Sequence, residues 1–233
     1  MPDGRVIVTG GTGGLGAGVV ERLLAAGNRL VVTWVVDEER ERAAAAYRDA
    51  PVELRHLDVL DEGAFGALAG EVDTGAGGLA GLVHLVGGYL DGHPFGESSM
   101  ADLDGQLALN LRSLSAALGA VLPRLAARGG GRVVAVSARA AVRPWAGASA
   151  YAASKAGVIA MVQAAQQEVI ADGVCVNCIM PSVIDTPANR AAEPGADHGR
   201  WVSPREIGEV VAFLMSEGAS AVTGAAIPVY GRA

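Results

Sequence analysis

The sequence is poor in cysteine, in aromatic residues and in clustered positive charge. It has only 2 Cys, Cys175 and Cys178, in a C-x-x-C pattern that could suit a redox or metal site. The pattern lies in the apolar segment 174–180, which favours a buried strand, and residues three apart on a strand face opposite ways. The 4 His are scattered along the chain, at His56, His84, His93 and His198. We therefore expect structural cysteines and no metal.

Other absences exclude further classes of protein. The net charge is −7, whereas surfaces that bind nucleic acid or anionic membranes need clustered Lys and Arg. No apolar run approaches the length needed to span a bilayer. The stretch from Met1 to Arg5 leads straight into an apolar segment and lacks signal-peptide architecture. We expect a cytoplasmic protein whose partner is a small molecule.

What the chain does have is a regular alternation of apolar runs and helix-like segments. Apolar runs predict strands at 5–9, 29–36, 52–58, 79–86, 132–137, 174–180 and 226–230. Helices are predicted at 15–26, 38–48, 62–69, 100–128, 151–171 and 204–216. Strands with so few polar residues indicate a parallel sheet covered on both faces. Because no repeat, linker or low-complexity tail interrupts the pattern, we expect one α/β domain over residues 1–233.

A tyrosine and a lysine stand one helical turn apart at the start of the helix predicted at 151–171. Side chains four apart share a helix face, so Tyr151 and Lys155 should meet. A phenol holds its proton to about pH 10, and a neighbouring positive charge lowers that pKa. The pair could then deliver a proton to a carbonyl or an imine. The alternative is an ordinary Tyr–Lys pair on the protein surface. Motifs elsewhere in the chain are needed to choose between these two interpretations.

A glycine-rich turn follows the first predicted strand. The stretch Thr9-Gly-Gly-Thr-Gly-Gly-Leu-Gly16 joins that strand to a helix, the context in which a dinucleotide pyrophosphate meets backbone amides. Asp58 and Val59 follow the third strand, where the Asp58 carboxylate could accept from an adenine amino group or could cap the next helix. Val86-Gly87-Gly88 ends the fourth strand, again with glycine where backbone could face a cofactor.

The end of the second predicted strand bears on which nucleotide binds. An acid there would bond the ribose hydroxyls of NAD and repel the extra phosphate of NADP. The position is occupied by Trp34, with Asp37, Arg40 and Arg42 nearby. Tryptophan removes the repulsion without supplying a clear phosphate ligand. We expect NADP(H) or NAD(H), with a slight preference for NADP(H).

Taken together, the motifs resemble those of the short-chain dehydrogenase/reductase family over essentially the whole chain. The matching residues are Thr9-Gly10-x-x-x-Gly14-x-Gly16, Asp58, Asn110, Tyr151-x-x-x-Lys155, and Asn177-x-Ile179-x-Pro181 followed by Thr186. The resemblance implies a Rossmann-type, doubly wound parallel sheet and hydride transfer to or from a nicotinamide. It also implies a homotetramer or homodimer packed through the two long helices.

The resemblance assigns roles to individual residues. It implies that Tyr151 is the general acid/base, and that Lys155 holds the nicotinamide ribose and depresses the Tyr151 pKa. Asn110 would hold a water that relays protons. The residues expected to contact the cofactor are Thr9, Gly10, Gly14, Leu15, Gly16, Trp34, Asp58, Val59, Val86, Gly87, Gly88, Tyr151, Lys155, Pro181, Ile184 and Thr186, with Thr186 and the Ile184 backbone holding the carboxamide.

Two departures from the family pattern stand out. The usual catalytic serine lies thirteen residues before the tyrosine, where this chain has Ala138. Ser137 is adjacent and remains a catalytic candidate, although on a strand its side chain would point the other way. The family's Asn-Asn-Ala-Gly is His84-Leu-Val-Gly87 here, and we expect His84 to be a packed strand residue.

Several local stretches resemble the dihydropteridine reductases, which also lack the serine. They are Val86-Gly-Gly-Tyr89, Ser137-Ala-Arg-Ala-Ala141, residues 181–190, and Pro194-Gly-Ala-Asp197 with Trp201. We therefore expect an NAD(P)H-dependent reductase of a conjugated, quinonoid or imine-like substrate such as a dihydropterin. Such a substrate is already electron-poor and needs less oxyanion stabilisation than a ketone.

Two alternatives remain open. One is a carbonyl reductase of 3-oxoacyl or polyketide ketones, and the other is a non-catalytic nucleotide-binding regulatory protein. We expect Tyr89, Trp145 and Trp201 to fall near the nicotinamide end, and at least two of them to wall a pocket for a flat substrate. Core packing is the alternative for Trp145 and Trp201. The polar segment 188–200 sits where a lid could close.

Overall fold

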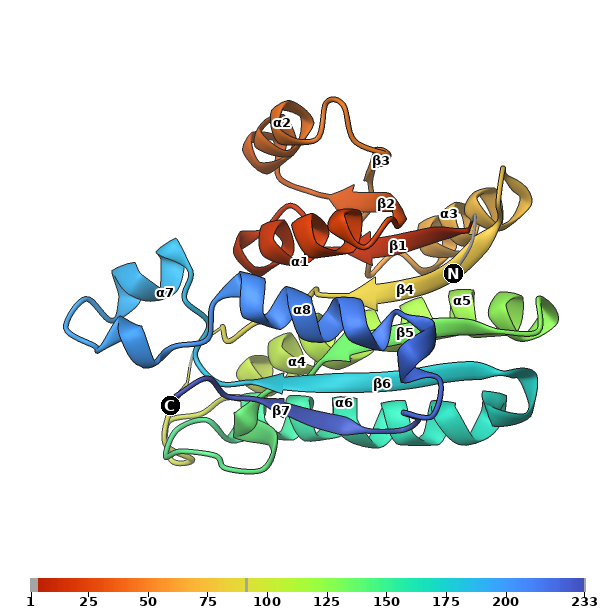
Figure 1. The fold of residues 1–233 in the computed structure, drawn as a ribbon. Coiled ribbons are helices and arrows are strands. Elements are labelled where there is room, and N and C mark those ends of the chain that lie inside the picture. The colour runs from red at the N-terminus through yellow and green to blue at the C-terminus, as the bar shows by residue number, and fades with distance from the viewer. Residues whose placement is uncertain (1–3, 91, 233) are drawn as a thin grey trace.

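The computed structural model describes residues 4–90 and 92–232. They form a 7-stranded parallel sheet in the order β3-β2-β1-β4-β5-β6-β7 (Figure 1). The strands are β1 (Arg5–Thr9), β2 (Arg29–Trp34), β3 (Val52–His56), β4 (Leu79–His84), β5 (Gly131–Val136), β6 (Val174–Pro181) and β7 (Ala226–Val229). The predicted α/β fold with a doubly wound parallel sheet is confirmed. The first residues, Met1–Asp3, lie outside the described part.

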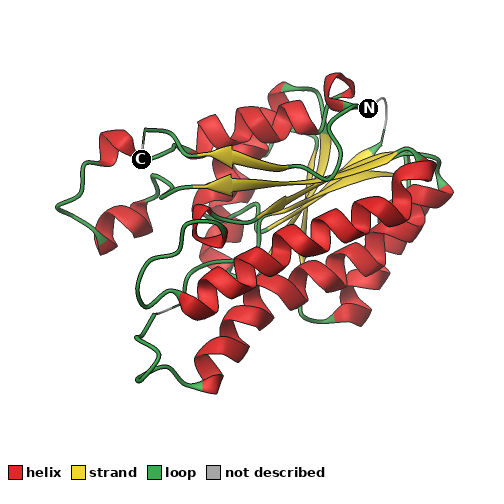
Figure 2. Cartoon of the chain, turned by 90° about the horizontal axis from the view of Figure 1, so that it is seen from below, coloured by secondary structure: helices red, strands yellow, loops and turns green. Residues whose placement is uncertain are grey.

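Helices cover both faces of the sheet, as Figure 2 shows. They are α1 (Gly14–Ala25), α2 (Asp37–Ala46), α3 (Glu62–Thr74), α4 (Met100–Leu107), α5 (Ser113–Ala127), α6 (Ser149–Val169), α7 (Pro187–Ala192) and α8 (Pro204–Leu214). On one face, Val19 of α1 and Ile207 of α8 are buried against the strands. On the other, Phe65 of α3, Leu114 of α5 and Val162 of α6 form a second core. Burial of strands on both sides explains why they contain so few polar residues.

The strand order reverses between β1 and β4, which pair in parallel side by side. In open α/β sheets, ligands collect beyond the carboxyl ends of the strands at such a reversal. The glycine turn after β1 and the Val86-Gly-Gly turn after β4 therefore lie at the same edge. In Figure 1 the strand arrowheads point to the edge where α7 and its flanking loop project.

The segment predicted as one helix over 100–128 is interrupted by a five-residue π-helical turn, Ala108–Arg112, between α4 and α5. Such turns insert an extra residue into a helix and are frequent at functional sites. Here the inserted turn carries Asn110, which is buried. One extra residue changes the hydrophobic periodicity of a helix very little, so the sequence pattern did not predict the π-helical turn.

The short helix α7 was missed within a segment expected to be a loop. Thr186 caps its first turn by accepting a hydrogen bond from the Asn189 amide, and Pro187 occupies the first helical position. Six residues are too few for apolar periodicity to be recognised. Within the described ranges, no helix is both long and apolar enough to cross a membrane.

Candidate active site

The glycine turn after β1 forms one wall of a groove with about 1010 Å³ of open space. A side chain at Gly16 would overlap the carbonyl oxygen of Gly10 and the backbone of Gly11, so only glycine lets the turn close against the start of α1. Gly10 itself has a φ of 67°, a left-handed conformation that favours glycine. The turn therefore requires glycine for its own shape and also leaves backbone facing the groove.

The N-terminus of α1 opens onto this groove with its amides uncapped. Gly13 at the N-cap makes no side-chain hydrogen bond, and the first turn contains no acidic residue. A helix of 12 residues with free N–H groups at its start attracts an anion through those donors and the helix dipole. The groove thus fits the pyrophosphate of a dinucleotide, as the sequence predicts.

The side chain of Thr9, a residue predicted to touch the cofactor, is buried and bonds His84 at the end of β4. The Thr9 hydroxyl lies 2.9 Å from His84 Nδ1. On the other side of the ring, His84 Nε2 lies 3.2 Å from the Ser113 hydroxyl. That hydroxyl donates its own proton to the Leu109 carbonyl. Ser113 must then accept from Nε2–H, so Nδ1 accepts from Thr9. Burial lowers the His84 pKa to about 3, with the Lys155 charge adding to the effect, so the ring is neutral. His84 is a packed strand residue, as expected.

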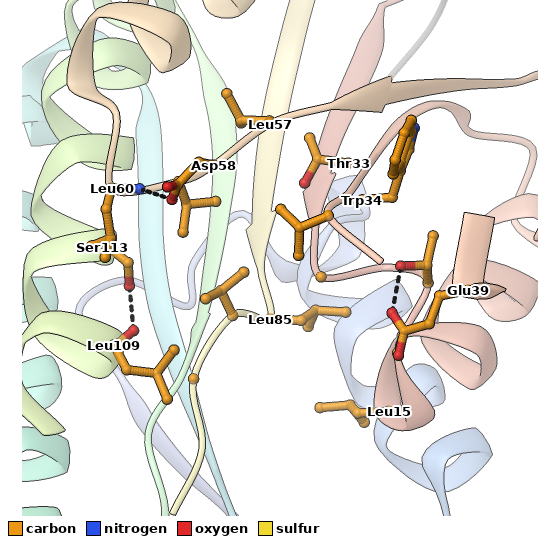
Figure 3. Close-up of a pocket in the computed structure, with 18 of the residues that line it drawn as sticks. Leu15, Thr33, Trp34, Glu39, Leu57, Asp58, Leu60, Leu85, Leu109 and Ser113 are labelled. Carbon is orange, nitrogen blue, oxygen red and sulfur yellow. Dashed lines mark hydrogen bonds between the residues drawn. The ribbon is translucent and has the colours of Figure 1, made fainter. Parts of the chain in front are cut away.

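The far end of the groove carries a carboxylate that the sequence did not single out. Glu39, in the first turn of α2, accepts a hydrogen bond of 2.9 Å from the Thr12 hydroxyl of the glycine turn (Figure 3). Trp34 ends β2 beside it, packs edge-on against His56 and lies under the Arg40 guanidinium at 5.3 Å. Glu39 is remote from the turn in sequence, and only the return of α2 toward the turn brings them together.

Asp58 lines the same groove. One of its carboxylate oxygens accepts from the Leu60 amide at 2.9 Å (Figure 3). The alternative role as a helix cap is wrong, because Asp61 caps α3 through the Ala64 amide. Val59 is buried and forms part of the wall. The Asp58 carboxylate is thus placed where an adenine amino group could donate to it.

Residues after β6 line the small cavity next to the groove and approach the glycine turn. Thr186 lies over the glycine turn, because a side chain added at Gly14 would come within 3.2 Å of its methyl group. The Ile184 carbonyl accepts from the Asn189 side chain and the Thr186 amide, both at 2.8 Å. The Ile184 amide has no hydrogen-bond partner in the described ranges and is available to a carboxamide oxygen.

A smaller cavity joins the groove to a second pocket, and Gly87 borders all three. Gly87 has a φ of 148°, and a side chain there would lie 2.6 Å from Asn110 Oδ1 and 2.7 Å from Lys155 Nζ. Asn110 forms two hydrogen bonds with the Gly88 backbone: its Oδ1 accepts from the amide at 2.8 Å and its Nδ2 donates to the carbonyl at 2.9 Å. The Nδ2 group also donates to the Ser154 hydroxyl at 3.1 Å. The Asn110 side chain therefore fixes the glycine loop, and the water-holding role that the resemblance implies for Asn110 stays a prediction.

Tyr151 and Lys155 both line the small cavity, with Pro181 at its edge. Lys155 is 3% exposed, and its ammonium donates to the Val136 carbonyl at 2.9 Å. Burial lowers the Lys155 pKa to about 8, although the neighbouring Cys178 thiol opposes the shift. Burial raises the Tyr151 pKa to about 12. The predicted lowering of that pKa is wrong for the chain alone, because burial removes the solvation that stabilises a phenolate.

The catalytic role considered for Ser137 stays a prediction: the residue lines the small cavity with Tyr151 and Lys155, but its hydroxyl already donates to another group. The hydroxyl is buried and donates to the Lys155 backbone carbonyl at 2.7 Å, which ties the end of β5 to α6. The side chain at the family's serine position, Ala138, borders the pocket beside Tyr151. The strand alternation used in the sequence argument accounts for this difference between neighbours.

Three aromatic rings meet at the second pocket, which has about 1160 Å³ of open space. Tyr89 lies 5.4 Å from Tyr151 and 5.9 Å from Trp145, measured between ring centroids. Trp145 lies 6.0 Å from Tyr151. Trp201, in contrast, is buried and does not line this pocket. Its ring centroid lies 4.4 Å from that of His198, which agrees with core packing, the alternative considered for this residue.

The two cysteines have structural surroundings. Cys175 lies 3.5 Å from the Ser220 carbonyl, and Cys178 is buried in the core that contains Val162. Both thiols are free. Within residues 4–90 and 92–232, no three His, Cys, Asp or Glu side chains gather to hold a metal.

Comparisons with known proteins place the chain among oxidoreductases. A family model described as enoyl-(acyl carrier protein) reductase matches residues 10–231. The 2,5-dichloro-2,5-cyclohexadiene-1,4-diol dehydrogenase of Sphingobium indicum is 30% identical, over 97% of this chain and 94% of that protein. The cis-4-hydroxycyclohexanecarboxylate dehydrogenase of Sinomonas cyclohexanicum is 33% identical, over 97% and 94%. A crystal structure of levodione reductase superposes with a TM-score of 0.90 at 29% identity, covering 98% of this chain and 96% of that one.

Proposed function

Because the chain belongs to the short-chain dehydrogenase/reductase family and is an NAD(P)-dependent oxidoreductase, we propose that it reduces a ketone on a ring to a secondary alcohol. The observation that carries this proposal is the position of Tyr151, which borders both the small cavity at Gly87 and the aromatic pocket. A phenol at this junction can give its proton to a carbonyl oxygen in the pocket. The nicotinamide, when bound, supplies the hydride.

The protonation state of Tyr151 is the one that reduction needs at neutral pH. Because burial raises its pKa to about 12, the phenol stays protonated and can act as the acid. The reverse reaction needs the phenolate, so alcohol oxidation should become faster as pH rises. Lys155, held by the Val136 carbonyl beneath Gly87, supplies positive charge below its pKa of about 8.

A cyclic substrate is supported by the shape of the pocket and by the relatives. Tyr89 and Trp145 present ring faces and edges beside Tyr151, and such walls favour a flat or compact ring over a long polar chain. Cyclohexane and cyclohexadiene rings appear in the names of the two dehydrogenases described above. The ketone would lie toward Tyr151, with the ring against the two other aromatic side chains.

A conjugated substrate such as a quinonoid dihydropterin is the second candidate, and Ala138 favours it. A ketone develops charge on its oxygen during reduction, and losing one donor aimed at that oxygen costs about a hundredfold. Ala138 supplies no donor, and the Ser137 hydroxyl is engaged elsewhere. The comparisons, however, give no support to a pterin substrate, and a ketone fits the dehydrogenases and reductases among the relatives better.

For the cofactor, we propose NAD(H) as the preferred nucleotide, against the slight preference for NADP(H) that Trp34 suggests. The Glu39 carboxylate lies against Thr12 in the glycine turn, at the end of the groove that an adenosine ribose would enter. A carboxylate there can accept from ribose hydroxyls and would repel a phosphate. Arg40 is turned toward the Trp34 ring.

The proposed reaction is tested by measuring NADH and NADPH oxidation by the purified protein with cyclohexanones, an acetoacetyl thioester and quinonoid dihydropterin. Fastest turnover of the cyclohexanones is expected. Fastest turnover of the dihydropterin would select the second candidate, and fastest turnover of the thioester would refute a ring substrate. No oxidation with any of the three would refute the proposed reaction.

The assembly remains a prediction. A homodimer or homotetramer packed through the long helices follows from the family resemblance alone. Light scattering of the protein as it elutes from a sizing column would measure it, and a monomer at micromolar concentration would contradict the prediction.

A further inference from the structure

Arg139 adds a positively charged side chain to the border of the aromatic pocket. It follows Ala138 directly and opens a three-residue turn after β5, Arg139–Ala141. Its carbonyl accepts from the Val142 amide at 3.1 Å and the Arg143 amide at 2.8 Å, so the backbone at the base of the side chain is fixed. The residue borders the same pocket as Tyr89, Trp145 and Tyr151.

The Arg139 guanidinium has no anionic partner in the part of the chain that the structure describes. Among the described residues, no carboxylate lies within ion-pair distance of it and no acceptor bonds it, and its guanidinium carbon lies 5.8 Å from the centre of the Tyr230 ring. Nearby Arg190 differs, because both oxygens of Asp185 bond it. Half-buried arginines normally find such a partner, since burying an unpaired charge is costly.

The acids around the pocket leave this charge uncompensated. Glu193 borders the pocket but forms no ion pair with Arg139. Asp197 borders the adjoining hollow next to Arg139 and Arg200, and its carboxylate accepts from the Gly199 amide. The protein as a whole carries a net charge of −7, so a local cation is needed if an anion is to enter.

We propose that Arg139 binds a carboxylate of the substrate, which makes the substrate a cyclic keto acid. This inference rests on the proposed function, because it assumes a ketone at Tyr151. A guanidinium presents paired N–H donors that match the two oxygens of a carboxylate, and such charge-assisted pairs are stronger than neutral hydrogen bonds. The guanidinium carbon also lies over the Tyr230 ring at 5.8 Å, within the range of a cation–π contact.

The arrangement gives each part of the substrate a separate partner. Tyr151 receives the ketone, Tyr89 and Trp145 contact the ring, and Arg139 holds the acid. Anchoring the carboxylate would orient the ring without any donor at the ketone other than Tyr151. This compensates for the absence of a serine at Ala138, since orientation of a bound substrate itself contributes to rate.

The test compares 4-oxocyclohexanecarboxylate with its methyl ester, which keeps the ring and the ketone but removes the charge. The unmodified protein should reduce the acid with a kcat/KM about 10- to 100-fold above that of the ester, mainly through KM. Arg139→Gln should abolish that preference, and Arg139→Lys should restore part of it. Arg143→Gln, an exposed arginine on the same loop, should keep the full preference.

The outcomes separate this inference from the proposed function. If the ester and the acid are reduced equally well, or if Arg139→Gln keeps the preference for the acid, the inference is overturned while ring-ketone reduction stands. If neither compound is reduced by the unmodified protein, the proposed function fails and the inference falls with it. Thermal unfolding of each variant checks that the fold is retained, and Arg139→Lys decides the matter if Arg139→Gln unfolds.

Discussion

The groove and the aromatic pocket lie at the same sheet edge but are built in opposite ways. The groove is shaped by what is missing: at Gly10, Gly16 and Gly87 a side chain would collide or would strain the backbone. The pocket is shaped by what is present, namely aromatic rings and a cation on loops after β4 and β5. A backbone surface can hold one constant ligand, the dinucleotide, whereas side chains on loops can change to suit different substrates.

The largest expected effect comes where the two regions meet. Tyr151→Phe removes the proton donor but keeps the ring, so kcat should fall about 10²- to 10⁴-fold while nucleotide binding persists. Steady-state assays of NADH oxidation measure kcat, and quenching of protein fluorescence by NADH measures nucleotide binding. Tyr89→Phe, which changes the neighbouring ring in the same way, should cost far less. Equal losses in both variants would mean that Tyr151 is a wall of the pocket and no acid.

The next effect tests whether the groove depends on absent side chains. Gly16→Ala should lower the free energy of unfolding by about 3 kcal/mol, which is about 6–12 °C in Tm, because its methyl group overlaps Gly10. Gly13→Ala is the matched control, since its nearest neighbour would lie 3.6 Å away and its φ of −77° suits alanine. Calorimetry of the protein without nucleotide measures both. Similar melting temperatures would show that the turn can adjust.

A smaller effect is expected at Glu39, one of two carboxylates that line the groove. Glu39→Gln keeps the hydrogen bond from Thr12 but removes the charge, so the NADPH-to-NADH ratio of kcat/KM should rise about tenfold. Glu38→Gln, the exposed neighbour on the same helix, should leave the ratio unchanged. A ratio that stays constant in Glu39→Gln would remove Glu39 from nucleotide choice.

The smallest catalytic effect is expected at Ser137, which lines the small cavity between the two regions but has its hydroxyl engaged. Ser137→Ala should leave kcat within about threefold of the original, because the hydroxyl bonds the Lys155 carbonyl. Stability should fall by about 1 kcal/mol, since that buried carbonyl loses its donor. Urea unfolding and steady-state kinetics on the same preparation measure both quantities. A hundredfold loss of kcat with unchanged stability would instead make Ser137 a catalytic donor.

Particular residues show how far sequence reasoning reached. The glycine turn, Asp58 and Tyr151 were placed correctly at one sheet edge, because each follows a strand or starts a helix in a recognisable pattern. Glu39 and Arg139 were missed as site residues because each carries a common charge in an unremarkable local context. Trp201 was expected at the pocket, yet its segment folds back and buries the ring against His198. The Tyr151 pKa was misjudged because spacing predicts a neighbour and says nothing about burial.

The sequence alone determined the fold and the existence of a dinucleotide site, since periodicity, glycine spacing and strand-to-helix turns are local properties of the chain. Tertiary structure decided which charges face the ligands and how strongly they are held. Glu39 reaches Thr12, Arg139 lies by Tyr230, and Lys155 bonds Val136 only after distant segments have packed. The protonation and solvation of an ionisable group depend on all the residues packed around it, and these residues come together only when the chain folds.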